Sequence, residues 1–236
     1  TVGEMASLLS HELNQPLAAI SSYATGSLNL LDARGGRSAP EPADIQLALK
    51  RIAQQAERAG RVIKSVHDFV RRRDKAREPV RPHELIDAVL PLVSLQARKL
   101  RVQVETRVPP TLPPVVCDRT MVEQVLLNLA RNAMQAMDEA RVASPSLLIQ
   151  VRRADAGDGA GKGWMEFSVA GEGPGIPPEG SQQLFTPFFT TKAEGMGLGL
   201  SLCRTVVEQH GGFLAFEPNR PRGTIIRLTL PTKAGE

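Results

Sequence analysis

The sequence predicts an α+β protein in two parts, an N-terminal antiparallel helical hairpin and then a sandwich with helices on one face of a mixed sheet. Two long apolar stripes with helical spacing fill the first part. The dipeptides Glu78-Pro79 and Arg81-Pro82 then interrupt the helical pattern. Beyond them, strand-like and helical stretches follow one another without strict alternation, which is typical of an α+β sandwich.

The two apolar stripes predict the hairpin. The second stripe alternates steps of four and three residues, the heptad pattern of a coiled coil or helical bundle. Between the stripes, residues 33–43 contain Gly35-Gly36, Pro40 and Pro42, which do not continue a helix. Two helices alone bury little apolar surface, so we expect a second copy to complete a four-helix bundle. The stripes are Leu9, Leu13, Leu17, Ile20, Ala24, Leu28 and Leu31, then Ile45, Leu49, Ile52, Ala56, Ala59, Ile63, Val66 and Val70.

The domain boundaries follow from these patterns. Residues 1–75 form the expected hairpin, residues 76–82 a linker, and residues 83–236 the α+β domain. In that domain we expect helices at His83–Gln96, Met121–Glu139 and Leu200–His210, and strands at Val102–Val108, Leu147–Arg153, Trp164–Ala170, Phe213–Glu217 and Thr224–Leu230.

Composition narrows the functional classes. The net charge is only +4, and the one dense basic run, residues 71–75, ends a helical stretch, where basic side chains complement the helix dipole. We therefore expect no nucleic-acid binding. Apolar runs are too short to span a membrane, so we expect no membrane contact by these residues. Two cysteines far apart favour a reducing, cytoplasmic location, whereas the longer protein could be soluble or anchored to the inner membrane. Cys117 and Cys203 lack metal-ligand spacing and are expected to be inert thiols. The chain begins at Thr1 inside an expected helix, which indicates a piece of a longer protein.

His11 lies in the first helix, within the segment Ser-His-Glu-Leu-Asn-Gln-Pro-Leu. At about 100° per residue, it lies roughly 200° from Leu9 and Leu13 and so points away from the apolar stripe. One ring nitrogen of such an imidazole can attack phosphorus, while the Glu12 carboxylate accepts a proton or holds the tautomer. A lone surface histidine is usually a spectator, so this hypothesis depends on the second part of the chain.

Asn128 and Asn132 stand four residues apart on one face of an expected helix. Carboxamide oxygens suit Mg²⁺, and their NH₂ groups can reach phosphate oxygens. Arg131 is available for phosphate charge. Two polar residues on a solvated helix face explain the same pattern equally well.

Two glycine clusters follow. Residues 171–176 come after a strand, and residues 195–200 open a helix, whose unpaired N–H groups suit anionic phosphates. Between them, residues 185–192 read Phe-Thr-Pro-Phe-Phe-Thr-Thr-Lys. We interpret this run as a mobile lid whose Lys192 can approach phosphate. A loop pinned by aromatic burial is compatible with the same role.

In this order, the segments resemble those of the sensor histidine kinases of two-component systems, over almost the whole chain. The His-Glu-Leu-Asn-Gln-Pro-Leu run resembles their histidine box, and the paired asparagines their Asn box. The Phe-rich run and Gly-Met-Gly-Leu-Gly-Leu resemble the lid and second glycine box, and Gly223-Thr224 the turn before the final strand. The amino-acid sequences of these motifs most resemble those of the nitrogen-fixation oxygen-sensor kinases of rhizobia. The resemblance implies a dimerisation and histidine phosphotransfer hairpin, then an ATP-binding domain of the Bergerat (GHKL) type.

The resemblance also implies roles. His11 would be the phosphoacceptor, Glu12 its acid/base neighbour, and Gln15 the residue that positions water for a phosphatase reaction. Asn132 would bind Mg²⁺, with Asn128 as a second contact to metal or phosphate. ATP and Mg²⁺ are the implied cofactors, and a second copy and a response-regulator receiver domain the implied partners. The implied nucleotide-binding residues are Asn128, Arg131, Asn132, Gly171, Gly173, Gly175, Ile176, Phe189, Thr190, Thr191, Lys192, Gly195, Met196, Gly197, Leu198, Gly199, Leu200 and Thr224.

One residue departs from the family pattern. The first glycine box reads Asp-x-Gly-x-Gly in the family, and its aspartate accepts a hydrogen bond from the adenine amino group. Aligning Gly173 and Gly175 puts Gly171 at that position. An unpaired amino group costs about 1 to 3 kcal/mol, or about 5- to 150-fold in affinity. Glu172 could substitute only through a local bulge, because adjacent side chains of a strand point to opposite faces.

Three explanations for Gly171 stay open: an engineered Asp→Gly change, a natural variant with weak ATP binding, or a pseudokinase. Because the other motifs are intact, we favour a kinase core with an impaired nucleotide site. A catalytically silent scaffold that binds a response regulator is the alternative. A plain ATPase of the gyrase–chaperone type would not need His11.

Overall fold

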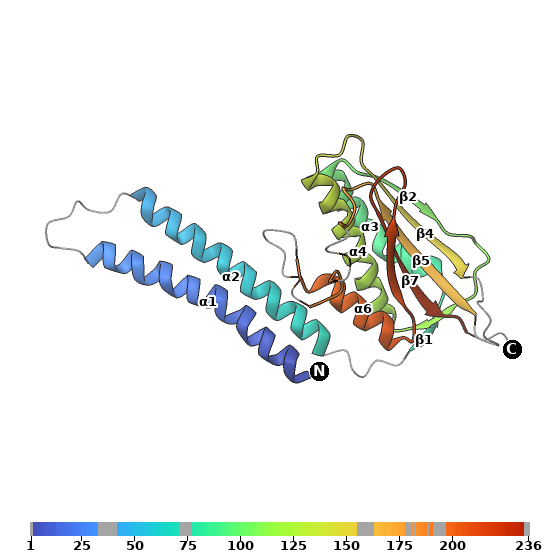
Figure 1. Ribbon diagram of the computed structural model, residues 1–236, viewed down its shortest axis with the longest axis horizontal. Helices are drawn as coiled ribbons and strands as arrows, with labels where there is room; N and C mark the ends of the chain where they lie inside the picture. The colour runs from blue at the N-terminus through green and yellow to red at the C-terminus, as the bar shows by residue number, and fades with distance from the viewer. Residues whose placement is uncertain are drawn as a thin grey trace. The chain divides into compact units, whose positions relative to one another are not determined.

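The structure is a computed structural model that falls into two compact units, Thr1–Arg73 and Asp74–Glu236 (Figure 1). Within the helices of the first unit, the side chains of residues 2–12, 32, 61–62 and 64–70 are not described. The described residues are 2–32, 42–70, 77–154, 163–177, 181, 183–187, 189–190 and 197–233.

The first unit is the predicted hairpin. Helix α1 spans Val2–Asp32 and helix α2 spans Pro42–Val70, and the two run side by side in opposite directions (Figure 1). Pro42 suits the first turn of α2 because its missing N–H would have no helical partner there, and Asp44 complements the positive end of the helix dipole. Pro16 lies inside α1, where it is buried.

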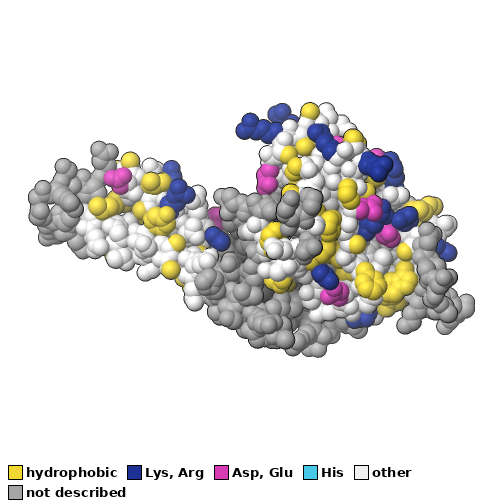
Figure 2. All heavy atoms as spheres, viewed as in Figure 1, with side chains coloured by type: hydrophobic (Ala, Val, Ile, Leu, Met, Phe, Trp, Pro, Cys, Tyr) yellow, Lys and Arg dark blue, Asp and Glu magenta, His cyan; other side chains and the backbone are white. Residues whose placement is uncertain are grey.

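The heptad pattern of α2 separates into two rows of different exposure. Ile45 and Ile52 are half-buried and Ala59 is 7% exposed. Leu49 and Ile63 are 60% and 56% exposed, and Leu28 and Leu31 of α1 are exposed as well. Figure 2 shows such hydrophobic side chains at the surface of the hairpin. One row therefore packs within the hairpin, and the other is left without cover among the described residues.

The second unit is built on a five-stranded sheet with the strand order β2-β4-β5-β7-β6. Strands β2 and β4 are parallel and the other neighbours are antiparallel, which confirms the predicted mixed sheet. Helices α3, α4 and α6 lie on one face of this sheet (Figure 1). The bounds are α3 Pro82–Leu100, β2 Gln103–Arg107, α4 Arg119–Glu139, β4 Ser146–Ala154, β5 Trp164–Gly171, α6 Gly199–Gln209, β6 Leu214–Pro218 and β7 Thr224–Pro231.

The predicted linker, residues 76–82, needs correction. Glu78–Val80 forms strand β1, which pairs antiparallel with strand β3, Val115–Cys117. Pro82 then opens α3. The prolines end the helical pattern, as expected, but proline is also tolerated on an edge strand and at the first turn of a helix. These residues therefore belong to the folded second unit.

The core lies between the helices and the sheet. On β5, Met165, Phe167 and Val169 alternate with more polar residues and are at most 2% exposed. They meet α4, whose Leu126 and Leu129 are 1% and 0% exposed. Fully burying a side chain of this size stabilises the fold by roughly 1.5 to 3 kcal/mol. The core thus fixes α4 against the end of β5, where the candidate site begins.

Candidate active site

Helix α4 is the centre of the candidate site. Asp118 caps its N-terminus, because a carboxylate oxygen accepts a hydrogen bond from the Met121 backbone N–H at 3.0 Å. The apolar face of the helix is in the core, so Asn128 and Asn132 stand on its other side and are half-buried. The two asparagines therefore lie on one face of α4, as their spacing predicts.

On one flank, α4 contacts the start of α6 through Asn128. Its Nδ2 donates to the Cys203 sulfur at 3.2 Å, and an Arg131 guanidinium nitrogen donates to its Oδ1 at 3.1 Å. A Cβ atom added at Gly199 would lie 2.9 Å from Asn128 Nδ2 and 3.2 Å from Oδ1. Glycine at this position is therefore what allows the carboxamide to lie against the first turn of α6.

Asn132, one turn further along α4, differs from Asn128 in its hydrogen bonds. It is half-buried and makes no hydrogen bond within the described part of the chain. Carboxamide groups at such positions normally find a partner. The Asn132 oxygen is therefore the freer of the two for a metal ion, whereas Asn128 is held by protein contacts.

The N-terminus of α6 adds backbone donors. Gly197 has φ +65°, a conformation that favours glycine, and Leu198 behind it is 4% exposed. Leu198 is the N-cap and provides no side-chain cap, so the first backbone N–H groups of α6 keep their donor capacity toward the described residues. A helix N-terminus of this kind attracts anions such as phosphate.

On the other flank, α4 contacts the end of β5. A Cβ atom added at Gly171 would lie 3.1 Å from Ala133 Cβ and 3.7 Å from the Met137 methyl carbon. At Gly173 it would lie 3.3 Å from a carbon atom of Ala136. The atoms nearest to a Cβ at Gly171 are thus carbon atoms of Ala133 and Met137, and none of these can replace a carboxylate as hydrogen-bond acceptor for an amino group.

The turn before β7 closes over Gly171. Thr224 pairs with Gly171 across the strands. Gly223 has φ +108°, and a Cβ atom there would lie 2.0 Å from the Gly171 carbonyl oxygen. Asn219 donates to the same oxygen at 3.3 Å. Gly175, with φ +86°, lies against the Gly223 carbonyl, so the first glycine cluster and the turn before β7 share one corner of the domain.

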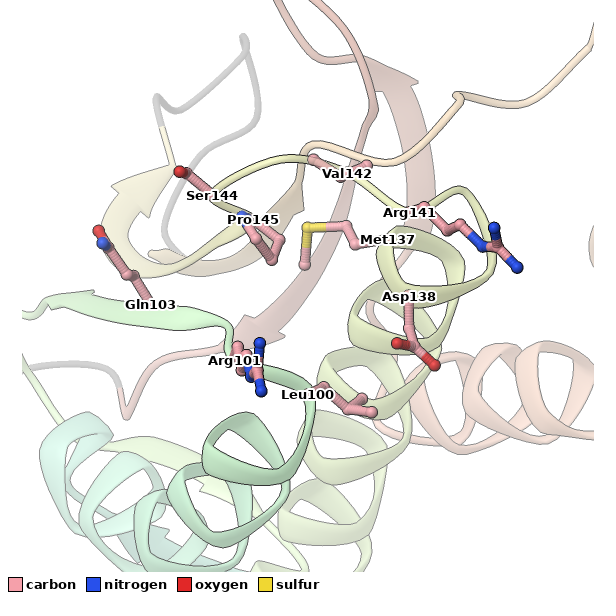
Figure 3. Close-up of a pocket in the computed structure, with 9 residues that line it drawn as sticks. All are labelled: Leu100, Arg101, Gln103, Met137, Asp138, Arg141, Val142, Ser144 and Pro145. Atoms are coloured by element: carbon pink, nitrogen blue, oxygen red, sulfur yellow. The ribbon is translucent and has the colours of Figure 1, made fainter.

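A pocket of about 410 Å³ opens at the C-terminal ends of α3 and α4 (Figure 3). Met137 projects from α4 toward Pro145 in this pocket, and its sulfur also accepts a hydrogen bond from the Glu172 backbone N–H at 3.3 Å. Met137 therefore separates the pocket from the end of β5. The pocket is lined by Leu100, Arg101, Gln103, Met137, Asp138, Arg141, Val142, Ser144 and Pro145.

The predicted lid is described in part. The Phe185 ring lies 6.1 Å from the Phe216 ring and 5.6 Å from the Arg204 guanidinium of α6, which agrees with an aromatic residue docked on the domain. Phe189 is half-buried and Thr190 exposed. The lid residues Thr191 and Lys192 and the glycine-cluster residues Gly195 and Met196 lie outside the described residues, whereas Leu200 and Ile176 are half-buried.

The candidate phosphoacceptor segment lies in α1. His11 and Glu12 belong to this helix, but their side chains lie outside the described residues, and so the predicted outward direction of the imidazole stays a prediction. Gln15 is exposed.

A buried histidine links the two site helices away from the asparagines. His210 is 3% exposed, and its Nε2 accepts a hydrogen bond from the Asp118 backbone N–H at 2.9 Å. Its Nδ1 lies 2.7 Å from the Val206 carbonyl, so this nitrogen carries the proton. Burial lowers the pKa of His210, which keeps the ring neutral near pH 7. The N-terminus of α4 is thereby fixed to the C-terminus of α6.

Comparison with known domain families decides the identity of the two units. The family described as His Kinase A (phospho-acceptor) domain matches residues 1–75. The family described as Histidine kinase-, DNA gyrase B-, and HSP90-like ATPase matches residues 117–234. The chain belongs to the sensor histidine kinases. Its second unit is therefore a member of an ATPase domain family, and its first a phosphoacceptor domain.

Curated relatives of this histidine kinase are sensor proteins. It is 41% identical over 233 residues to the C4-dicarboxylate transport sensor protein DctS of Rhodobacter capsulatus. This match covers 98% of this chain and 34% of the relative. It is 40% identical over 230 residues to the sensor protein FixL of Bradyrhizobium diazoefficiens, covering 98% of this chain and 43% of the relative. The chain thus spans less than half the length of these relatives.

Solved histidine kinases share the fold. The complex of the histidine kinase ThkA with the response regulator protein TrrA is 26% identical, with a TM-score of 0.69, and the match covers 98% of this chain and 62% of the kinase chain. The catalytic domain of ThkA alone is 33% identical with a TM-score of 0.56, covering 67% of this chain and 97% of that domain.

Among the described residues, no helix combines the length and apolar character that a membrane span requires.

Sequence reasoning missed three residues of this site. Cys203 was expected to be an inert thiol, yet its sulfur contacts Asn128; its place one helical turn after Gly199 was the available signal. Met137 and Asn219 contact the end of β5 from distant parts of the chain. No local pattern indicates those two contacts.

Proposed function

We propose that this chain is the catalytic core of a sensor histidine kinase, which binds Mg²⁺–ATP beside α4, phosphorylates His11 and passes the phosphoryl group to an aspartate of a response-regulator receiver domain. The observation that carries the proposal is the contact of Asn128 with Gly199 at the N-terminus of α6. It brings the Asn helix and the second glycine cluster together in one place, as phosphate binding requires.

The residues of this corner fit a magnesium–nucleotide complex. Asn132 offers a carboxamide oxygen with no partner within the described chain, and Asn128 presents a second oxygen next to Arg131. Oxygen ligands of this kind suit Mg²⁺. The N–H groups at the start of α6 and the Arg131 guanidinium suit the phosphates. When bound, Mg²⁺ neutralises phosphate charge.

The phosphoryl step is assigned to the hairpin. A ring nitrogen of His11 attacks the γ-phosphorus, the new P–N bond forms as the bond to the ADP oxygen breaks, and the displaced ring proton passes to Glu12. Gln15, one turn further along α1, is proposed to orient water against the partner's aspartyl phosphate. This would give the same unit a phosphatase activity.

Two copies of the hairpin are proposed to form a four-helix bundle. The exposed heptad row of α2, with Leu49 and Ile63, and the exposed Leu28 and Leu31 of α1 support this assembly. A second copy would remove these apolar side chains from water, with a gain of roughly 25 cal/mol for each Å² buried. The response regulator as partner is supported by the relative ThkA, which was solved in complex with TrrA.

The contact with the adenine base of ATP is proposed to be the weak part of the site. Strand β5 keeps regular pairing up to Gly171, which favours a Glu172 side chain on the opposite side of the chain from α4. Ala133 and Met137 provide no strong acceptor. We therefore expect ATP affinity about 5- to 150-fold below that of a site with an aspartate. The same observation favours a second candidate function, a silent scaffold that binds a response regulator without using ATP.

The decisive experiment is incubation of the chain with radiolabelled Mg²⁺–ATP, with His11→Gln as the matched variant. The proposal predicts acid-labile label on the parent protein and none on the variant. Because His11 lies in the hairpin, the variant should still bind Mg²⁺–ATP with unchanged affinity. ATP turnover that persists without labelling in both proteins would indicate a plain ATPase, and absence of both binding and labelling would indicate the scaffold.

A further inference from the structure

We propose that Cys203 is a positioning residue for Asn128, which holds the carboxamide in one orientation and keeps its oxygen on the side of Arg131. The inference rests on the proposed function in so far as that oxygen serves Mg²⁺ or phosphate. Cys203 lies on α6 and Asn128 on α4, so the contact joins the two helices that form the site.

The two ends of the Asn128 carboxamide meet different partners. Its NH₂ group donates to the Cys203 sulfur at 3.2 Å, and its oxygen accepts from the Arg131 guanidinium at 3.1 Å. A rotation by 180° would direct the NH₂ group at a guanidinium, which has only donors. It would also remove the hydrogen bond that the Cys203 sulfur accepts from the NH₂ group. Both contacts therefore favour the same orientation.

The protonation state of the thiol strengthens this preference. Cys203 is 3% exposed, and burial raises the pKa of its thiol to about 11, so it stays protonated near pH 7. Its sulfur lies 4.0 Å from the Val125 carbonyl oxygen, to which the S–H group donates. The sulfur lone pairs are then left for the Asn128 amide.

Gly199 lies on a third side of the carboxamide. The backbone of Gly199 lies against it so closely that any Cβ atom there would approach Nδ2 to 2.9 Å. Asn128 is thus enclosed by a thiol, a guanidinium and a glycine backbone. A side chain held in this way loses little conformational entropy when its oxygen takes a ligand. Cys203 itself is buried and acts only through Asn128.

The test compares Cys203→Val, which keeps an apolar side chain of similar size but has no acceptor, with Cys203→Ser, which keeps an acceptor. Cys117→Val is the matched control, because Cys117 is also a fully buried thiol and lies before the N-terminus of α4, more than two helical turns ahead of Asn128. Two quantities are measured for each protein. They are the Kd of Mg²⁺–ATP by calorimetry, and the NMR signals of the Asn128 side-chain NH₂ group in protein without nucleotide, assigned with Asn128→Ala.

We expect Cys203→Val to weaken Mg²⁺–ATP binding about fivefold to tenfold, the size of one hydrogen bond, and to shift and broaden the Asn128 NH₂ signals. Cys203→Ser and Cys117→Val should stay within about twofold of the parent and keep those signals. Unchanged signals in Cys203→Val, or an equal loss of affinity in Cys117→Val, would overturn the inference. If even the parent fails to bind Mg²⁺–ATP, the proposed function fails, and the NMR signals alone still decide whether Cys203 orients Asn128.

Discussion

The two flanks of α4 differ in chemistry although each pairs the helix with a glycine. On the α6 flank, Gly199 lies against Asn128, which is held by Cys203 and Arg131. On the β5 flank, Gly171 lies against Ala133 and Met137, which offer carbon and sulfur. The α6 flank therefore presents polar groups, as the proposed phosphate and metal contacts require, and the β5 flank presents apolar surface, where the base is proposed to lie.

The difference shows that a glycine motif has to be interpreted through the residue that it faces. Gly199 is required because a larger residue would displace a polar side chain of the site. At Gly171 a Cβ atom would meet the Ala133 Cβ atom at 3.1 Å, so α4 would have to give way by a few tenths of an ångström. We therefore expect a substitution on the α6 flank to disturb the polar contacts of the site, and one on the β5 flank to act through packing.

The largest effect is expected at the α6 flank. Gly199→Ala places a Cβ atom 2.9 Å from Asn128 Nδ2 and must displace the carboxamide. Mg²⁺–ATP affinity should fall at least tenfold, because the hydrogen bonds to Cys203 and Arg131 are disturbed together. Calorimetry measures the loss.

Gly60→Ala is the matched control for this substitution. Gly60 lies in α2, and an added Cβ atom has nothing within 4 Å. We expect this variant to bind Mg²⁺–ATP like the parent and to be stabilised by up to about 1 kcal/mol through helix propensity. Normal binding by Gly199→Ala would show that Asn128 does not need its present position.

A smaller effect is expected on the free energy of unfolding, through the buried His210 that links α4 to α6. Burial lowers the pKa of His210 below that of the unfolded chain, so the unfolded state binds more protons. The stabilisation is complete above the ordinary histidine pKa of about 6.5 and is lost as the pH falls from there toward the folded pKa. Urea titrations at several pH values, followed by the single tryptophan, Trp164 on β5, measure this dependence.

The contribution of His210 is isolated with two variants. His210→Gln, which keeps a donor and an acceptor but does not titrate, should flatten the pH dependence below pH 6.5. His83→Gln, at the half-buried position near the start of α3, is the matched control substitution. An equally steep acid loss in His210→Gln would place the titrating group elsewhere.

The sequence predicted the hairpin and the mixed sheet because both depend on local periodicity. The apolar stripes follow from helical spacing, and alternation along β5 follows from the pleat. Strands β1 and β3 were missed because each has only three residues, and a proline in β1 argued against a strand. Their pairing, Pro79 opposite Val116, is a tertiary contact that no local pattern specifies.

The same limit applies to the site. The asparagines and both glycine clusters were found from their spacing, since each is a local pattern. Which of them touch could not be predicted, because the contacts of Gly199 with Asn128 and of Gly171 with Ala133 join segments distant in the chain. Cys203 shows the consequence, since its role is visible only from α4.

The central claim is that this histidine kinase core has an impaired base contact at Gly171. The direct measurement is Mg²⁺–ATP titration by calorimetry on the parent, Gly171→Asp and Gly171→Ala, followed by assay of phosphohistidine. Gly171→Ala introduces the same contact with Ala133 but no acceptor. We expect at least tenfold tighter binding and more phosphohistidine for Gly171→Asp alone. Equal binding by all three, or no binding by any, would contradict it.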